Sequence, residues 1–580
     1  MSKLKKSGAR KWVLGLLAGV SSIAMFASCA PASAEADAET KAEIRALKEQ
    51  LKRLEKRLES QAQSQRQTER KVERVEQATV EAGPPGGPVR LVSKDGVPWP
   101  SAFYYKAVTI TPGGFFEFAG VERSRFIGAD IATPFQNIPY GNNVASYGNE
   151  YRFSARRSRF TMQTDADLDP ITHVKMYLAT DFLGAGQTAN LNQSDSFNFR
   201  FRELYMQLDR SDFGGFGGVH LMAGQAYSLI GMNSQGTLAG TFLTPPVIDD
   251  QYMPGFTWAR QPGIRLSKDI TPELQWAFSA EQSSTTYILP ASDINGHVGP
   301  CILNANLAIG GTGGIAGTGC APNNIPGVFN VGPVSGSLSN ALNETTTNRL
   351  PDLITKAAWD PTFIDRHIHV EVGGMLRDFT DQVYWGQHSV WGANIEAGVI
   401  IPIIPKWLDF QFSGVSGNGN GRYGAAQIND STFTWTGGAQ PIHERQVMVG
   451  LTAHVTPQTD VYLFAGGEFA SANYNFVKVA AQPLFNIAAG TYSYGYGNPA
   501  YNNIGCNFEG PPALTCVGNI KDVRQLTGGF WHNFYDGPAG KIRVGAQYSY
   551  TVKDSFAGVS GAYRGTESMF FTSLRYYPFN

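Results

Sequence analysis

Apolar and polar side chains alternate without a break over residues 541–550. One parity is apolar or aromatic and the other is mostly polar: Ile542, Val544, Ala546, Tyr548 and Tyr550 against Lys541, Arg543, Gly545, Gln547 and Ser549. Successive side chains of a β-strand point to opposite faces of its sheet, so this segment predicts a strand with one apolar and one polar face. A second strand is expected over residues 569–579, where Pro578 breaks the register.

Further alternating segments follow short turns that contain proline. The turns lie at residues 169–170, 269–272, 360–361, 404–405, 456–457 and 536–538, and proline and aspartate favour such tight turns. Other connections are long and rich in Gly, Asn, Ser and Thr, over residues 285–348, 415–440 and 482–522. Short turns at one end and long loops at the other are typical of an all-β, transmembrane antiparallel β-barrel whose long loops lie outside the cell. The length of the region predicts about 16 strands, with 18 as the alternative.

Composition favours the same fold class. Glycine accounts for 65 of 580 residues, aromatic residues for 12% and charged residues for only 16%. After residue 30 no run is long and apolar enough for a membrane helix, so this composition fits many strands and turns better than an α/β enzyme. The formal net charge is −1 and no basic stripe is present, which argues against a nucleic-acid partner.

The N-terminal part predicts export followed by a helix. Residues 1–34 have the basic start, apolar stretch and small-residue cleavage site of a secretory signal peptide, and a lipoprotein signal that ends at a lipidated Cys29 is the alternative. Residues 35–82 carry apolar side chains at heptad spacing between charges, which predicts a periplasmic coiled-coil helix that joins copies of the chain. A solitary solvated helix is the alternative. Residues 83–106, rich in Pro and Gly, are expected to link this helix to the barrel at 107–580.

Four cysteines remain after residue 34, in two close pairs. Exported proteins meet an oxidising compartment, so disulfide bonds are expected. Four cysteines allow three connectivities. Local pairing of Cys301 with Cys320 and of Cys506 with Cys516 is the simplest, because each pair lies within its own turn-rich loop.

Residues 113–125, 151–159, 181–184 and 256–262 resemble the DcaP-like trimeric porins of Gram-negative bacteria, a family related to the phosphate-selective porins O and P. The resemblance covers most of residues 107–282 and the closing strand, whose aromatic end is similar to the C-terminal signature of outer-membrane barrels, although Asn580 follows Phe579. It implies a homotrimer of 16-stranded barrels in outer-membrane lipid, a periplasmic coiled coil, and passage of small anions such as dicarboxylates.

Arginines are the candidate site residues, because basic side chains that line a pore lower the electrostatic barrier to anions. The first set of pore-lining or anion-binding candidates comprises Arg123, Arg125, Arg152, Arg156, Arg159, Arg200 and Arg202, with Arg157 in the same run. The second set comprises Arg260, Arg265, Lys541 and Arg543. Apolar parity switches between Phe153 and Phe160, which predicts a bulge or bend there. The alternative is that these arginines pair with interior acids such as Glu117, Glu150 and Glu203, or lie at the level of the lipid head groups.

Two other patterns favour structural interpretations over metal sites. Asp165, Asp167 and Asp169 resemble the start of a calcium loop but lack its Gly and terminal Glu, so a turn is expected. His367 and His369 share the polar face of a strand, where a wet interior position is favoured over a metal pair. No metal or other cofactor is expected.

The expected function is passive diffusion of small hydrophilic solutes, with a preference for dicarboxylates, phosphate or similar anions, across the outer membrane. Two other classes of function provide alternatives. A structural barrel could be tethered to peptidoglycan through the coiled coil. An outer-membrane lipase would need a convergent Ser and His, and no segment offers that arrangement, so an enzyme is not expected.

Overall fold

The structure, a computed structural model, describes residues 102–579 except 185–197, 216, 289–301, 305–327, 331–333, 338–339, 346–347, 365, 384–385, 435–437, 480–488 and 510–515. The predicted signal peptide, coiled coil, linker and the pair Cys301 and Cys320 lie outside the described residues. Among the residues described, no helix is long and apolar enough to cross a membrane.

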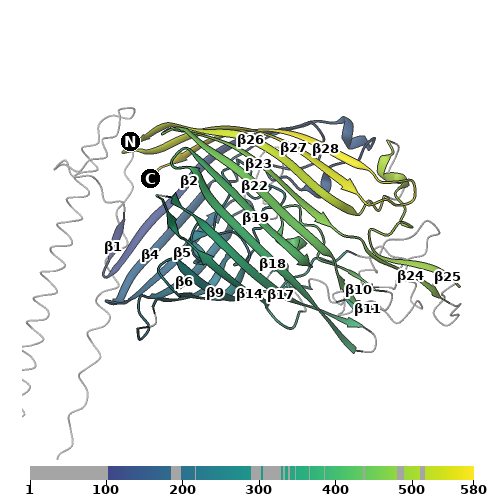
Figure 1. Cartoon of the computed structure of the whole chain (residues 1–580). Coiled ribbons are helices and arrows are strands. Elements are labelled where there is room, and N and C mark those ends of the chain that lie inside the picture. The colour runs from purple at the N-terminus through teal and green to yellow at the C-terminus, as the bar shows by residue number, and fades with distance from the viewer. Residues whose placement is uncertain are drawn as a thin grey trace, which may run out of the picture. The chain divides into compact units, whose positions relative to one another are not determined.

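The described region forms a closed antiparallel β-barrel of 16 strands, which decides between the predicted counts of 16 and 18 (Figure 1). The wall strands, in order, are β2 (Val108–Arg123), β4 (Arg159–Asp169), β5 (Thr172–Asp181), β6 (Arg200–Arg210), β7 (Val219–Tyr227), β8 (Arg260–Asp269), β9 (Leu274–Glu281), β14 (Asp352–Trp359), β17 (His369–Val383), β18 (Gly386–Ile404), β19 (Leu408–Asn418), β22 (His443–Thr456), β23 (Thr459–Ala470), β26 (Ile520–Gly537), β27 (Gly540–Ser555) and β28 (Arg564–Tyr577).

Short elements accompany the wall. The strands are β1 (Phe103–Tyr105), β3 (Glu150–Ser154), β10 (Ile302–Asn304), β11 (Val328–Asn330), β12 (Val334–Ser337), β13 (Asn340–Thr345), β15 (Thr362–Phe363), β16 (Arg366–His367), β20 (Ser431–Phe433), β21 (Ala439–Pro441), β24 (Asn473–Val479) and β25 (Gly490–Tyr496). The 3-10 helices are η1 (Phe135–Asn137), η2 (Val144–Tyr147), η3 (Ala239–Thr241), η4 (Gly421–Tyr423) and η6 (Ile504–Asn507).

The barrel closes where β2 pairs with both β28 and β4. The C-terminal half of β2 pairs with β28, from Phe116 opposite Tyr576 to Arg123 opposite Met569. Its N-terminal half pairs with β4. β3 pairs with the C-terminal half of β2, on the same side of β2 as β4. Residues 155–158 interrupt the strand between β3 and β4. The predicted bend between Phe153 and Phe160 is therefore confirmed.

All six predicted proline turns join neighbouring wall strands at one end of the barrel. A seventh turn, over residues 211–218 between β6 and β7, contains no proline and was missed. Long connections leave the opposite end over residues 124–149, 182–199, 228–259, 282–351, 419–442 and 471–519. Figure 1 shows β24 and β25 extending from this end, away from the C-terminus.

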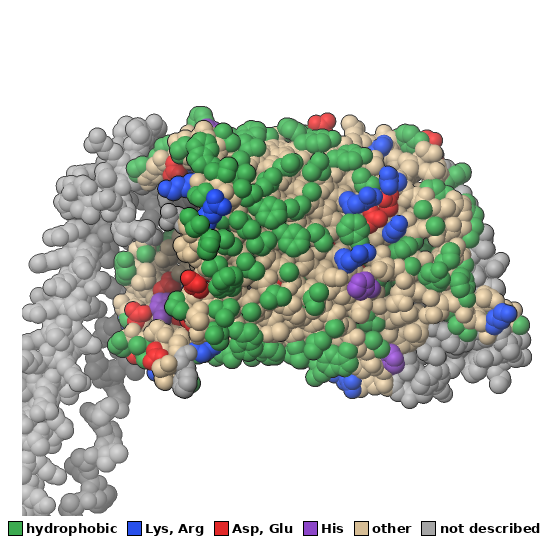
Figure 2. Space-filling model, in the orientation of Figure 1, with side chains coloured by type: hydrophobic (Ala, Val, Ile, Leu, Met, Phe, Trp, Pro, Cys, Tyr) green, Lys and Arg blue, Asp and Glu red, His purple; other side chains and the backbone are tan. Residues whose placement is uncertain are grey.

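The two predicted faces of β27 are present. On the outer face Tyr548 is 52% exposed, whereas on the inner face Gln547 and Ser549 are buried. Hydrophobic side chains cover much of the outer wall in Figure 2, as expected for a surface in contact with lipid. The inner polar face was expected to line water, but here it is covered by protein, because connections from the long-loop end fold into the barrel.

The connection at residues 228–259, hereafter the inward loop, supplies most of that cover. Its Ile248, Met253 and Phe256 are buried in one cluster with Phe571 of β28 and Trp531 of β26. Residues of the 124–149 and 419–442 connections form a second buried cluster with wall residues of β23 and β26. Burial of apolar side chains removes them from water, so these clusters stabilise the folded-in position of the loops.

Buried carboxylates on the inner wall also hold the inward loop. Glu281 accepts a hydrogen bond from the backbone N–H of Leu229 at 2.8 Å, and Glu371 accepts one from Asn233 at 3.1 Å. Glu468 accepts from the N–H groups of Gly255 and Ala426, both at 2.9 Å. Buried N–H groups need such acceptors, since an unpaired polar group away from water is costly.

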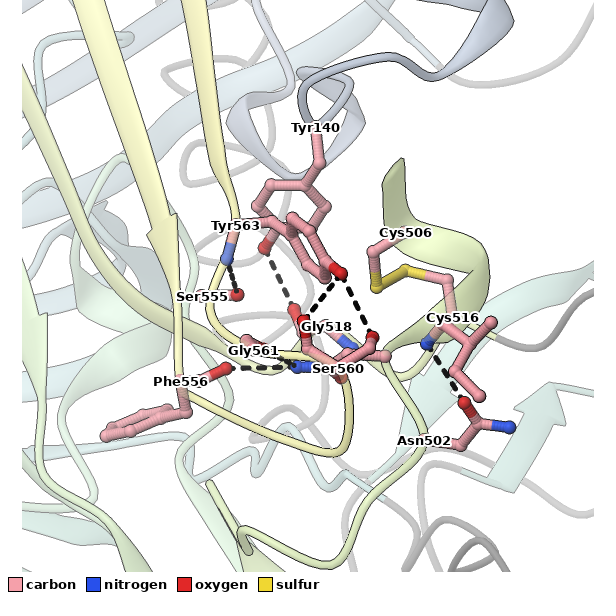
Figure 3. The surroundings of a disulfide bond; sticks show 12 residues. Tyr140, Asn502, Cys506, Cys516, Gly518, Ser555, Phe556, Ser560, Gly561 and Tyr563 are labelled. Atoms are coloured by element: carbon pink, nitrogen blue, oxygen red, sulfur yellow. Dashed lines mark hydrogen bonds between the residues drawn. A yellow bond between two sulfur atoms is a disulfide. The ribbon is translucent and has the colours of Figure 1, made fainter. Parts of the chain in front are cut away.

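The predicted disulfide between Cys506 and Cys516 is present, with 4.6 Å between the two Cα atoms. Figure 3 shows it beside Tyr140, whose hydroxyl donates to the carbonyl of Gly518 at 2.9 Å. The ammonium group of Lys553 lies 4.1 Å from the centre of the Tyr140 ring. The disulfide thus belongs to a packed contact between the 124–149 and 471–519 connections.

Two sequence interpretations need correction. Asp165 and Asp167 lie within β4 rather than in a turn, and both contact the ring of His173 on β5. His369 is buried rather than wet, because its ring contacts Asp360 at 2.7 Å and Glu371 at 3.1 Å. His367 lies outside the wall strand, in β16, and is exposed.

Candidate functional site

Six arginines gather on one part of the inner wall, and we call them the arginine cluster. They come from the four wall strands β28, β4, β6 and β8 and from the interruption before β4: Arg157, Arg159, Arg200, Arg202, Arg260 and Arg575. The wall brings them together because β28 and β4 both pair with β2. Four carboxylates interact with them: Glu117, Asp181, Glu203 and Asp250. These six positive and four negative groups sum to a formal charge of +2.

Glu117 of β2 holds the end of the cluster nearest to the closing strand. Its Oε1 accepts a hydrogen bond from Nε of Arg575 at 3.0 Å, and its Oε2 lies 3.7 Å from Nε of Arg157. Ser573 donates to the same carboxylate at 2.6 Å. Glu117 was predicted as an acid that could pair with arginines, and it does so.

Asp181 at the end of β5 holds the middle of the cluster. Arg200 donates to both of its oxygens, at 2.7 and 3.0 Å, and Arg202 donates to Oδ2 at 2.8 Å. Arg202 also donates to the hydroxyl of Tyr227 at 2.8 Å. Bidentate contacts of this kind fix the planes of the guanidinium groups.

Asp250 links the inward loop to the arginine cluster. Nη2 of Arg157 donates to its Oδ1 at 2.7 Å. Burial alone would raise the pKa of the Asp250 carboxyl, but Arg157, Arg159, Arg202 and Arg575 together hold that pKa below its ordinary value. Asp250 is therefore ionised at neutral pH, and the inward loop faces the arginines through a negative charge.

The neighbouring Asp249 behaves differently. Its Oδ1 accepts from Nε2 of Gln547 at 2.7 Å, while Oδ2 is buried without a hydrogen-bond partner among the described residues. Burial raises the pKa of Asp249 to about 6. Adjacent carboxyls on one loop thus have opposite pKa shifts, because Asp250 pairs with Arg157 and is affected by four arginines, whereas burial outweighs the effect of Arg157 on Asp249.

Aromatic rings flank the arginines and leave some donors unused. The guanidinium of Arg575 lies 4.5 Å from the ring centre of Trp531, and that of Arg159 lies 5.3 Å from Phe115. Nη1 of Arg157, Nε of Arg159 and Nη1 of Arg260 are buried without a hydrogen-bond partner in the part of the chain that the structure describes. Guanidinium groups with free donors in such a setting are suited to binding carboxylates or phosphates.

Of the first predicted set, Arg159, Arg200 and Arg202 belong to the cluster. Arg123 instead is fully buried and bonds Glu150 at 2.6 Å and carbonyls of residues 129–132, so it fixes the start of the 124–149 connection. Arg156 bonds Asp130 and the carbonyls of Phe182 and Gly184. Arg125 donates to the carbonyl of Ser146, and Arg152 is exposed on β3. These four lie outside the cluster.

Among the second set, Arg260 joins the cluster, and Arg265 is buried against the carbonyls of Tyr227 and Thr237. Arg543 pairs with Asp460 at 2.8 Å, and Lys541 lies 3.5 Å from Asp536 near the β26–β27 turn. Arg575 was missed, although the alternation of β28 places it on the same parity as the buried Phe571 and Ser573. That alternation could have found it.

No group of three or more His, Cys, Asp or Glu side chains that could hold a metal ion is found within the described ranges. Glu117, Asp181 and Asp250 of the arginine cluster are each held by guanidinium groups instead. The chemistry that this arrangement offers is attraction of anions.

One solved structure with a similar fold is an outer-membrane channel. The crystal structure of the outer membrane channel DcaP of Acinetobacter baumannii superposes with a TM-score of 0.53 at 14% identity, over 82% of this chain and 99% of that chain. The fold implied by the resemblance to DcaP-like porins is thereby confirmed.

Two looser matches are an anion-selective porin from Comamonas acidovorans (TM-score 0.39, 10% identity, 81% of this chain and 99% of that chain) and OprB of Pseudomonas putida (TM-score 0.39, 11% identity, 80% and 94%). The sequence matches no protein-family model and no curated protein.

Proposed function

We propose that the protein is a passive channel of the outer membrane that favours small hydrophilic anions. The observation that carries this proposal is the arginine cluster, in which six guanidinium groups on the inner wall face four carboxylates. A fixed positive charge inside a barrel lowers the electrostatic barrier for anions and raises that for cations. Selection then depends on wall charge and pathway width.

The unused donors of the cluster favour carboxylate and phosphate solutes. Nη1 of Arg157 and Nη1 of Arg260 have no partner among the described residues, and the planar fork of Arg matches a carboxylate or phosphate in a bidentate contact. Both donors are buried, so a small dicarboxylate or inorganic phosphate would first be attracted by the charge of these guanidinium groups. Weak contacts at several positions allow a solute to enter and also to leave.

The assembly belongs to the same proposal. A homotrimer in outer-membrane lipid fits the barrel fold and the apolar outer wall, and the predicted heptads at 35–82 would join three chains in the periplasm, within reach of peptidoglycan. Conductance in steps of three would support the trimer. Steps of a single size would contradict it.

A second candidate function is a structural barrel that conducts little. The observation that favours it is the packing of the inward loop, which buries Ile248, Met253 and Phe256 against the wall. In this case the barrel would anchor the predicted coiled coil, and the arginines would serve only to hold the inward loop through Asp250.

Planar-bilayer recording of the purified protein separates the two candidates. The channel proposal expects conductance steps in KCl that are blocked by added succinate or phosphate. Well-folded protein that leaves the bilayer silent would contradict the channel and favour the structural barrel. Folding is checked on the same sample by the heat-dependent mobility shift that intact barrels show on electrophoresis.

A further inference from the structure

The outer surface of the barrel carries a groove of about 430 Å³ on the wall formed by β22, β23, β26 and β27. Its floor and sides are mainly apolar, with Val447, Ala465, Leu526, Tyr550 and Val552, and Arg524 borders it. The apolar side chains of the groove are on the outward parity of their strands, and no residue of the arginine cluster lines it.

Small residues on β23 create the groove. Ala465 pairs with Leu526 of β26 and Val449 of β22, and Gly467 pairs with Arg524 and Val447. These two small residues of β23 therefore lie between the larger side chains of β22 and β26. A side chain at Gly467 would come within 2.8 Å of the Phe469 ring and 3.3 Å of Cγ of Arg524, so this position is closely bordered even without one.

A row of charged side chains lies at the end of the groove nearest to the long connections. Four basic residues, namely Arg445, Lys521, Arg524 and Arg564, are exposed there, and two acids, Asp522 and Asp554, lie among them. The side chain of Arg524 is 45% exposed and that of Arg564 is 62% exposed. Four bases and two acids leave a formal charge of +2.

The acids hold the bases in place. Asp522 accepts from Nε of Arg524 at 2.7 Å, and Asp554 accepts from Nε of Arg564 at 2.7 Å and also from Arg524. Figure 2 shows Lys and Arg side chains with acidic ones among them on this face, beside the hydrophobic part of the wall. An apolar groove that ends at a basic row matches a molecule with a hydrocarbon chain and an anionic head.

We propose that this groove binds a phosphorylated glycolipid of the outer leaflet, of the lipid A type. One acyl chain would lie along Ala465 and Leu526, and a phosphate would lie against Arg524 and its basic neighbours. The long connections mark the outer side of the membrane, so the basic row stands at the outer leaflet. The inference rests on the outer-membrane location in the proposed function, but not on conduction.

Charge complementarity distinguishes this occupant from the others. A second copy related by a two-fold axis would bring the same basic row against itself, at the cost of repulsion between like charges. A neutral lipid would fill the apolar groove and leave the basic row without a counter-charge. A phosphate head supplies that counter-charge, and contacts between guanidinium and phosphate are among the stronger hydrogen bonds in proteins.

Native mass spectrometry of the full-length protein in detergent, titrated with diphosphoryl lipid A, tests the proposal. We expect retained lipid on the wild type and roughly tenfold weaker retention for Ala465→Leu, which fills the groove, and for Arg524→Gln, which removes charge. Ala397→Leu is the matched control, because Ala397 is also exposed on the outer wall but lies on β18. It should retain lipid as the wild type does.

Three results would overturn the proposal. They are unchanged retention by Ala465→Leu, equal retention of lipid A from which both phosphates have been removed, and spontaneous disulfide dimers of Ala465→Cys that show a second copy on this face. Conductance recorded on the same variants keeps the two proposals apart, since groove substitutions should leave conductance and reversal potential unchanged. Loss of lipid binding would leave the channel intact, and a silent channel would leave the lipid result intact.

Discussion

The inward loop contacts two parts of the inner wall that hold it by different forces. On one side Asp250 meets the arginine cluster through the ion pair with Arg157. On the other side Ile248, Met253 and Phe256 pack against Met448, Trp531 and other apolar residues of β22, β23 and β26, which we call the packed wall. Only one residue separates Ile248 from Asp250, so the loop changes environment over a very short distance.

The difference suggests a division of roles. Apolar packing is insensitive to salt and pH, and it fixes where the loop lies. The charges of the arginine cluster include donors without a hydrogen-bond partner among the described residues, and in the proposed channel they would act on ions that approach. The packed wall should therefore control the position of the loop, and the arginine cluster should control selectivity.

Phe256→Ala should have the largest effect on the position of the loop. Phe256 is 1% exposed, and truncation of a buried Phe costs roughly 3–5 kcal/mol. We expect hydrogen exchange of residues 247–256 to accelerate strongly, with little change in reversal potential. Phe213→Ala, at an exposed position in the β6–β7 turn, is the control and should leave exchange in the loop unchanged. Equal protection in Phe256→Ala and wild type would contradict the role of the packed wall.

Arg157→Gln should shift selectivity away from anions. It removes one of the six positive charges and the partner of Asp250, while Glu117 keeps its contact with Arg575. The reversal potential under a KCl gradient should move toward cation permeation. Arg210→Gln, which changes a partly exposed arginine near the short turns, should leave it unchanged. A shift of the same size in both variants would show that the cluster has no special role.

Asp250→Asn should shift selectivity in the opposite direction, by a smaller amount. It removes a negative charge and frees Nη2 of Arg157, so anion preference should rise. The gain is expected to be smaller because loss of the ion pair also loosens the arginine. Reversal potentials of this variant and of Arg157→Gln that move in the same direction would contradict the electrostatic account.

The smallest expected effect is a pH dependence from Asp249. Its pKa is raised from 3.8 to about 6, so the folded-in loop binds the proton more tightly than the released loop. The resulting stabilisation is complete below the ordinary pKa and is lost as pH rises through about 6. After correction for intrinsic rates, exchange of residues 247–256 should be roughly tenfold faster at pH 8 than at pH 5. Asp249→Asn should reduce the dependence, and a dependence that is unchanged in this variant would assign it to another group.

The sequence predicted the wall better than the interior, for physical reasons. A strand with one lipid face has a two-residue period that local sequence displays, as residues 541–550 do. Proline marks six of the short turns, whereas the turn at 211–218 has no proline and escaped notice. The bend between Phe153 and Phe160 was visible as a change of parity.

The interior depends on contacts between distant residues, which local patterns do not display. Arg123 and Arg159 are equivalent in sequence terms, yet one is buried among loop carbonyls and the other lies in the arginine cluster. Their separation is decided by the path of the 124–149 connection. The inward loop could not be identified from sequence, since its buried Ile248 and Phe256 stand in a segment without periodicity. Arg575 is the exception, because parity alone would place it inside.

The most direct test of the central claim is the reversal potential of the wild-type protein in a planar bilayer under a KCl gradient. An arginine cluster that lines the pathway predicts a reversal potential displaced toward that of chloride, and added phosphate or succinate should reduce the current. A reversal potential displaced toward that of potassium, from protein that folds and conducts, would contradict the assignment of selectivity to these arginines.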